Sequence, residues 1–281
     1  MDKAHQATDK VLEKLEKQLN SLYTEAYKEI KKQIAEVVSK MEFTPDMTPQ
    51  QRYTLAIKYD RLTKLEKQIS ESLKNVNSEA VKIINDEMTN VYRTNYEFMV
   101  EGIKEGGVFP VLSKSEIKEI LTEQITPFKK LAIDALKNSA QIKQQLTREL
   151  ISGIMQGESI PQLAKRIRGT FESNLERSIK IARTETTRVE NSARQDTADQ
   201  AAKSGLPMKK KWIATKDERT RDSHKSADGQ VVDYDKPFIV GGEELMYPGD
   251  ENGSAGNVIN CRCTMVSFVD TEALKKQKQS K

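Results

Sequence analysis

Apolar residues recur at alternating three- and four-residue spacings through the first part of the chain, with Lys and Glu between them. These apolar positions are Leu12, Leu15, Leu19, Leu22, Ala26, Ile30, Ile34, Val37 and Met41. A seam this narrow predicts a long amphipathic helix that buries a single stripe. Because the pattern stops at Thr44-Pro45 after about four heptads, packing within a helical bundle is favoured over an intermolecular coiled coil.

The helical pattern continues to about residue 205. Thr48 with Gln51, and Ser113 with Glu116, have the spacing of capping boxes that begin helices. Ser78 is expected to cap a further helix. Ser173 or Asn174 is expected to begin the last long helix, which Gly205 ends. Aromatic residues make up only 6% and charged residues 31% of the chain, which fits helices with narrow apolar stripes better than one large core.

The pattern changes at about residue 206. Short stretches rich in β-branched and aromatic residues alternate with Gly-containing turn pairs such as Asp228-Gly229 and Pro248-Gly249, which predicts a small antiparallel sheet. The expected fold class is therefore α+β, a mostly helical and elongated N-terminal two-thirds followed by a small β-containing module. The expected ranges are helical hairpins over 1–107, a second helical region over 108–205, the module over 206–270 and a polar, disordered tail over 271–281.

Both cysteines and one of the two histidines lie in the module. Cys261 and Cys263 are two residues apart, so in an extended segment their side chains point the same way. With His224 as a third ligand they could bind zinc, and the fourth ligand would come from Asp217, Asp222, Asp228 or a water molecule. The alternative is two reduced cysteines in a small core with His224 hydrogen-bonded nearby.

The segment Asp217–His224 is expected to be a loop with a dense ionic and hydrogen-bond network. Asp217, Arg219 and Arg221 would lock this loop, because Arg binds carboxylates through two parallel hydrogen bonds. The only Trp, Trp212, precedes the loop, and Arg183 and Glu185 are expected to dock the preceding helix onto the module. The rival hypothesis is an acid–base or phosphate site, with His224 as the proton-transfer group.

Several function classes lack their sequence signals. The chain has no Gly-rich phosphate loop and no H-E-x-x-H motif. The second histidine, His5, lies near a terminus expected to be mobile, so a site with several histidines is not expected. The net charge of +4 is too small to indicate nucleic-acid binding by itself. Neither a secretory signal nor an apolar run of about 20 residues is found, so no membrane span is expected.

A series of spaced elements runs from residue 182 to residue 263. These elements are Ala182-Arg183-Thr184-Glu185, Trp212, Asp217-x-Arg219-Thr220-Arg221, His224, Gly229, Phe238, Pro248-Gly249 and Asn260-Cys261-Arg262-Cys263. In this order they resemble the phage head morphogenesis family, the minor head proteins that include the phage Mu F-like proteins. The resemblance covers about residues 150–269, and the N-terminal helices match no family beyond their helical pattern.

The resemblance implies a non-enzymatic minor structural protein of a tailed phage or prophage. Such a protein would act in head morphogenesis at the portal vertex and aid DNA packaging or delivery. Its expected partners are the portal protein, the major capsid or scaffolding protein and, weakly, DNA. It would be found in the virion and, during assembly, in the host cytoplasm. The alternative function is a nuclease or toxin-like transferase centred on Asp217, Arg219, Arg221 and His224.

Overall fold

The computed structural model describes residues 2–40, 43–58, 61–103, 109–123, 130, 133–134, 136 and 139–279. By their contacts the residues fall into two compact units. The first contains Met1–Leu15, Ile84–Lys130 and Lys180–Lys281, and the second, the helical unit, contains Glu16–Ile83 and Leu131–Ile179. The boundary expected at residues 107 and 108, and Met41 of the apolar seam, lie outside the described residues.

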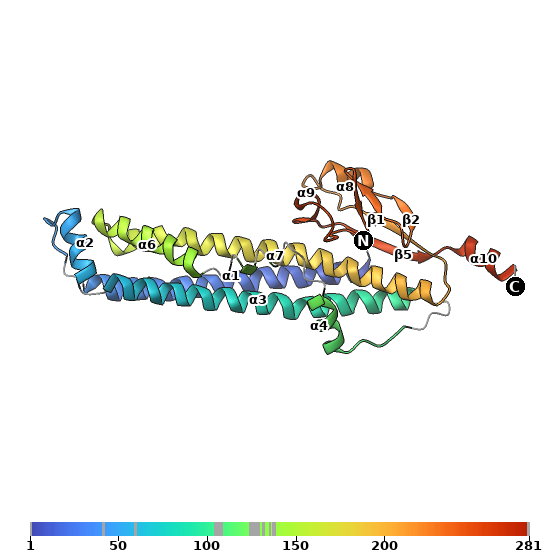
Figure 1. Ribbon diagram of the computed structural model, residues 1–281, viewed down its shortest axis with the longest axis horizontal. Coiled ribbons are helices and arrows are strands. Elements are labelled where there is room, and N and C mark those ends of the chain that lie inside the picture. The colour runs from blue at the N-terminus through green and yellow to red at the C-terminus, as the bar shows by residue number, and fades with distance from the viewer. Residues whose placement is uncertain are drawn as a thin grey trace. The chain divides into compact units, whose positions relative to one another are not determined.

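Helices dominate the chain up to residue 203 (Figure 1). They are α1 Lys3–Ser39, α2 Pro49–Lys58, α3 Arg61–Gly102, α4 Lys114–Glu123, α6 Ser139–Met155 and α7 Ile160–Lys203. The predicted seam is buried or half-buried along α1, and Leu19, Ile30 and Ile34 are fully buried. Both predicted capping boxes are confirmed: Thr48 and Ser113 exchange hydrogen bonds with Gln51 and Glu116.

Two helix starts predicted from the sequence are wrong. Ser78 lies inside α3, because the buried stripe continues in phase from Leu73 to Ala80. Asn174 lies inside α7, and its amide donates to the carbonyl of Thr170 one turn earlier. A residue type that caps helices can therefore sit in a helix interior when its side chain has another partner, as that of Asn174 has here.

The segment that begins α1 is bound to α7 within the first unit. Asp2 accepts two hydrogen bonds from the buried guanidinium of Arg194, at 2.7 and 2.9 Å. His5 is only 5% exposed, and its Nδ1 lies 2.8 Å from the Glu190 carboxylate. The expectation that His5 lies in a mobile terminus is therefore wrong, because buried charged partners on α7 hold it.

The module over 206–270 contains an antiparallel sheet of three strands in the order β2-β1-β5. Its strands are β1 Met208–Ile213, β2 Val231–Asp233 and β5 Thr264–Val269, and a separate hairpin is formed by β3 Phe238–Val240 and β4 Glu243–Leu245. Two short helices, α8 Asp222–Ala227 and α9 Ala255–Val258, accompany the strands (Figure 1). A helical majority followed by a small antiparallel module confirms the predicted α+β class.

The module's core surrounds Trp212, which is fully buried on β1. The Trp212 ring meets Phe238 and His224 edge-on, with ring centroids 5.4 and 5.7 Å apart. Cys261 and Cys263 belong to the same apolar cluster. Lys210 is also fully buried two residues before Trp212, and its ammonium group donates to Gln195 and to the Met246 carbonyl. This core is small and contains polar groups that each need a partner.

The end of the chain differs from the prediction of a disordered tail over 271–281. Thr271–Gln279 form the exposed helix α10, whose first turn is capped by the Asp270 carboxylate. The cap and the favourable placement of Glu272 early and Lys278 late in the helix explain why a polar segment is helical here. None of the helices described has both the length and the apolar character that crossing a bilayer requires.

Candidate metal centre

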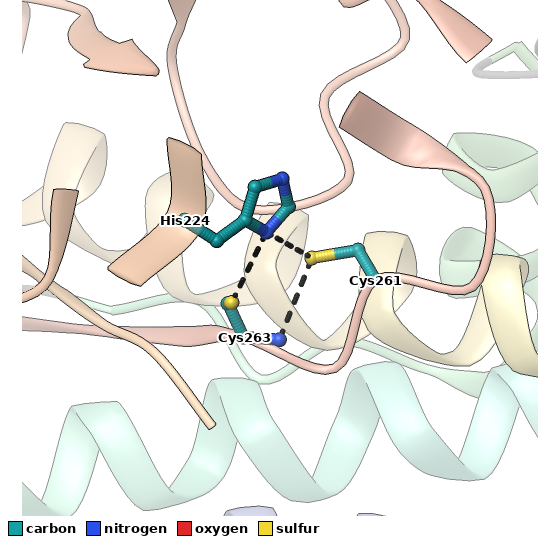
Figure 2. Close-up of side chains that lie close together, drawn as sticks. All are labelled: His224, Cys261 and Cys263. Carbon is teal, nitrogen blue, oxygen red and sulfur yellow. Dashed lines mark hydrogen bonds between the residues drawn. The ribbon is translucent and has the colours of Figure 1, made fainter. Parts of the chain in front are cut away.

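Three side chains from separate parts of the module converge. His224 comes from α8, Cys261 follows α9, and Cys263 directly precedes β5. The Nδ1 atom of His224 lies 3.3 Å from the Cys263 sulfur and 3.6 Å from the Cys261 sulfur (Figure 2). All three residues are only 2% exposed. The structure thus brings together the three predicted metal ligands.

The backbone before the cysteines takes a left-handed turn. Asn260 has a φ of 56°, a conformation that Asn tolerates better than most residues other than Gly. Its N–H donates to the hydroxyl of Thr184 on α7. The turn reverses the chain after α9 so that Cys261 and Cys263 both face His224, as their i, i+2 spacing predicts.

Helix α7 fixes the cysteine segment through a ladder of side chains. Thr187 donates to the Cys261 carbonyl, Asn191 to the Cys263 carbonyl and Arg194 to the Met265 carbonyl. Asn191 also accepts from the Met265 N–H at 2.9 Å. The four-residue step from Thr187 to Asn191 rises about 6 Å on a helix, close to the about 6.6 Å of a two-residue step on an extended chain such as that from Cys261 to Cys263. Arg194 lies only three residues after Asn191. Thr187, Asn191 and Arg194 on α7 therefore bind alternate backbone carbonyls of the segment that contains the two cysteines.

The loop before α8 holds the same segment from another direction. Asp217 pairs with the guanidinium of Arg262 through both carboxylate oxygens. Arg221 donates to the Ile259 carbonyl, and Thr215 donates to the Arg262 carbonyl. The hydrogen bond from Arg262 lowers the pKa of Asp217 well below its ordinary value. The predicted network therefore includes Asp217 and Arg221, and their partners lie between and beside the cysteines.

The other predicted network residues differ in their placement. Arg219 is peripheral, because its side chain is 77% exposed and 3.7 Å from Asp217. Glu185 is fully buried and pairs with Arg188 one turn later on α7, while Arg183 is half-buried. The Pro248-Gly249 turn packs on this part of α7: a Cβ at Gly249 would lie 3.1 Å from the Arg188 backbone.

Hydrogen bonding makes the two thiols unequal. Bonds from Cys261 and His224 lower the pKa of Cys263 to about 5, and the backbone N–H of Thr215 also stabilises its thiolate. The neighbouring Cys263 and complete burial raise the pKa of Cys261. The N–H of Cys263 in turn points at the Cys261 sulfur, at 3.4 Å. A metal ion would deprotonate both thiols, and these N–H donors would stabilise the resulting charge.

The distances fit a zinc site. Zinc binds thiolate sulfur at about 2.3 Å and imidazole nitrogen at about 2.0–2.1 Å, so a tetrahedral arrangement separates the two donors by roughly 3.6 Å. The observed separations of 3.3 and 3.6 Å lie close to this value. His224 also has a buried Nε2 without a partner among the residues described, so the histidine is oriented by its Nδ1 contacts and by Trp212.

The residues of the rival acid–base hypothesis do not converge. Asp217 faces Arg262, and His224 faces the two sulfurs. His224 also lies on helix α8, so the expectation that the whole of Asp217–His224 is a loop is wrong at its C-terminal end. The Arg221 side chain reaches the Ile259 carbonyl instead of a common centre with His224.

Sequence reasoning missed several residues that build this site. Thr187, Asn191 and Arg262 were not predicted to contact the cysteine segment. The spacing of these residues in the sequence could have indicated the contacts. Residues 187, 191 and 194 share one helix face, and Arg262 lies between the two cysteines.

Comparison with known proteins identifies relatives of two kinds. Residues 144–266 match the family of Phage Mu protein F like proteins. The chain is 27% identical to minor head protein GP7 of Bacillus phage SPP1 over 269 residues, which are 94% of this chain and 85% of that protein. These two matches confirm the resemblance to the phage minor head proteins. No solved structure matches the chain.

Another relative is named as an enzyme. The chain is 31% identical over 174 residues to the NAD(+)–arginine ADP-ribosyltransferase EFV of Enterococcus faecalis, a match of 61% of this chain and 35% of that protein. A Bacillus subtilis protein, YqbB, is 27% identical over 57% of each chain. The chain therefore spans about a third of the enterococcal protein and over half of YqbB, whereas it spans most of the SPP1 protein.

Proposed function

We propose that this chain, whose residues 144–266 match the Phage Mu F-like proteins, is a minor structural protein of a tailed-phage head. The extent of the match to the SPP1 minor head protein carries the proposal, because the similarity includes the N-terminal helices as well as the module. In this proposal, helices before residue 206 make the partner-specific contacts, and the module over 206–270 is the stable unit shared with other family members.

Particle composition tests this proposal. A phage or prophage lacking the gene would be complemented with the wild-type chain, and gradient-purified procapsids and heads would be analysed by quantitative mass spectrometry. We expect a few copies per particle, with abundant host proteins measured as the contamination control. A chain that is no more abundant in particles than these host proteins would contradict the proposal.

The finer proposal is a position at the portal vertex, with the portal protein as the main partner and a role in DNA packaging or delivery. The family resemblance supports this position. Co-expression with the portal protein followed by co-purification tests the contact, and the major capsid protein serves as the comparison. Binding to the capsid protein alone would move the proposed site away from the portal.

The match to a named ADP-ribosyltransferase raises an enzymatic alternative. We propose that this chain is not such an enzyme, because the match leaves most of the enterococcal protein outside it. The separation of Asp217 from His224 by their own partners also supports this view. Incubation with NAD⁺ and an arginine-containing acceptor, followed by nicotinamide quantification, is expected to give no turnover. Turnover above that of heat-inactivated protein would favour the enzyme.

We further propose that His224, Cys261 and Cys263 hold a zinc ion that stabilises the module. The donor separations and the N–H groups directed at both sulfurs support it. Elemental analysis of protein purified under reducing conditions is expected to give one zinc per chain, and Cys261→Ser is expected to lose it. Metal-free wild-type protein that does not take up added zinc would contradict this proposal.

A further inference from the structure

We propose that this metal centre is open, with three protein ligands and an exchangeable water molecule as the fourth ligand. The inference rests on the proposal that zinc binds there. Zinc sites with a purely structural role are usually closed by four protein ligands, whereas a set of two cysteines and one histidine occurs where zinc keeps an open position. The choice therefore depends on whether the chain supplies a fourth ligand.

The described part of the chain offers no fourth His, Cys, Asp or Glu at the cluster. The group within ligand distance consists of His224, Cys261 and Cys263. A fourth ligand from a water molecule was one of the alternatives left open by the sequence, beside Asp217, Asp222 and Asp228. The positions of these three carboxylates decide between the alternatives.

Each of the three carboxylates is engaged elsewhere. Asp217 binds the Arg262 guanidinium through both oxygens. Asp228 accepts from the Ala214 N–H at 2.9 Å. The Asp222 side chain is 99% exposed and pairs with Lys225. Moving any of them to the metal would break these contacts, so the residues that the structure describes supply no fourth carboxylate, and we assign this position to a water molecule.

A surface hollow of about 450 Å³ lies beside the loop that precedes α8. The hollow is lined by Ala214, Thr215, Lys216, Asp217, Glu218, Lys225 and Asp228. Thr215 belongs both to this wall and to the centre, because its backbone N–H donates to the Cys263 sulfur. His224 directly precedes Lys225, another wall residue. In this proposal, a small Lewis base enters from this hollow and replaces the water molecule.

Cobalt substitution of the full chain tests the open position. Four-coordinate Co²⁺ bound to thiolates has visible absorption that responds to a change of ligand. Titration with azide or imidazole is expected to shift the d–d bands saturably, with one ligand bound per cobalt. Asp222→Ala and Asp228→Ala are expected to leave the starting spectrum unchanged. His5→Gln is the control for His224→Ala, and only the latter should alter that spectrum.

The outcomes separate this inference from the zinc proposal. Cobalt that binds but does not respond to either ligand would show a closed centre and overturn the open position, leaving the metal site intact. A starting spectrum altered by Asp222→Ala or Asp228→Ala would identify a fourth protein ligand and overturn it as well. Failure of the reduced wild-type chain to bind cobalt or zinc would overturn the metal site itself.

Discussion

The helical unit and the C-terminal module are stabilised in different ways. The helical unit buries aliphatic side chains in regular stripes, including Leu19, Ile30, Ile34 and Ile69, all fully buried. The module has a smaller apolar core around Trp212 and relies on directed bonds to the segment around its cysteines. Apolar burial is non-directional and tolerates substitution of similar volume. Directed bonds lose their contribution when one partner changes.

This difference teaches where a single substitution should matter most. In the helical unit many equivalent contacts share the stabilisation. In the module, removal of one partner leaves a buried polar group unsatisfied, which costs about 1–3 kcal/mol for each neutral group. The following predictions test this comparison, beginning with the largest expected effect.

Truncation of the Trp212 side chain should have the largest effect. Trp212→Ala is expected to lower the unfolding free energy of the module by about 3–5 kcal/mol, because it empties the centre of a small core. Chemical unfolding followed by near-UV circular dichroism of the tyrosines and by far-UV circular dichroism measures it. Ile30→Ala is the matched control in the helical unit and should leave the near-UV band of Trp212 unchanged. A loss below about 1 kcal/mol for Trp212→Ala would break the comparison.

Removal of the metal is expected to have the second-largest effect, and to destabilise the module without destabilising the helical unit. With free zinc 1,000-fold above its dissociation constant, binding adds about 4 kcal/mol to the unfolding free energy. A chelator is therefore expected to abolish the near-UV signal of Trp212 at a lower temperature while the helical far-UV signal persists. Identical melting curves with and without chelator, in protein shown to contain zinc, would contradict a stabilising role of the ion.

Lys210 should make the module more stable at alkaline pH. Burial lowers the pKa of Lys210 to about 8, whereas an unfolded lysine titrates near 10.4. Between these values the unfolded chain binds more protons, so the unfolding free energy rises with pH by up to about 3 kcal/mol. Below pH 8 both states are protonated and the full cost of burial is present.

Lys210→Met tests this titration. The variant is expected to remove the alkaline rise, so the difference in unfolding free energy between wild type and variant should change with pH between 8 and 10. Denaturant unfolding at several pH values measures that difference. A difference that stays constant over this range would show that Lys210 keeps its ordinary pKa.

A smaller effect is expected from one bond of the α7 ladder. Thr187→Val keeps the side-chain volume but leaves the buried Cys261 carbonyl without its Thr187 donor, and we expect a loss of about 1–2 kcal/mol. Thr197→Val is the matched control, because the Thr197 hydroxyl donates to a carbonyl one turn earlier in the same helix. An equal loss of unfolding free energy in the two variants would show that the bond from Thr187 to the cysteine segment contributes no more than a bond within the helix.

The smallest effect on the unfolding free energy is expected for Arg219, in contrast to Arg221 in the same loop. Arg219→Ala is expected to change the unfolding free energy by less than about 0.5 kcal/mol, because its side chain is exposed. Arg221→Ala removes a hydrogen bond to the Ile259 carbonyl and should cost more. Thermal melting of the two variants side by side measures this difference, and the reverse order would contradict the assigned network.

Local patterns in the sequence predicted much of the fold. The apolar seam predicted α1, and the Gly-containing turns predicted the strands on either side of them. The spacing of Cys261 and Cys263 predicted that their side chains point the same way. The uninterrupted length of α3 and α7 could not be predicted, because Tyr23 binds Asn77, and Asn77 in turn binds Asn174, from positions distant in sequence. Arg262 presented the same difficulty, since only the folded loop brings Asp217 to it.

The side chains of Asn191 and Arg194 on α7 also occupy part of one edge of the sheet. Both backbone groups of Met265 that face away from β1 are occupied by Asn191 and Arg194. A strand edge with free N–H and C=O groups is a template for pairing with another chain and for aggregation. Helix side chains here occupy the outer edge of β5 at Met265, and the opposite edge strand, β2, is only three residues long. Loss of Asn191 would expose that edge, so such variants are expected to aggregate as well as to melt earlier.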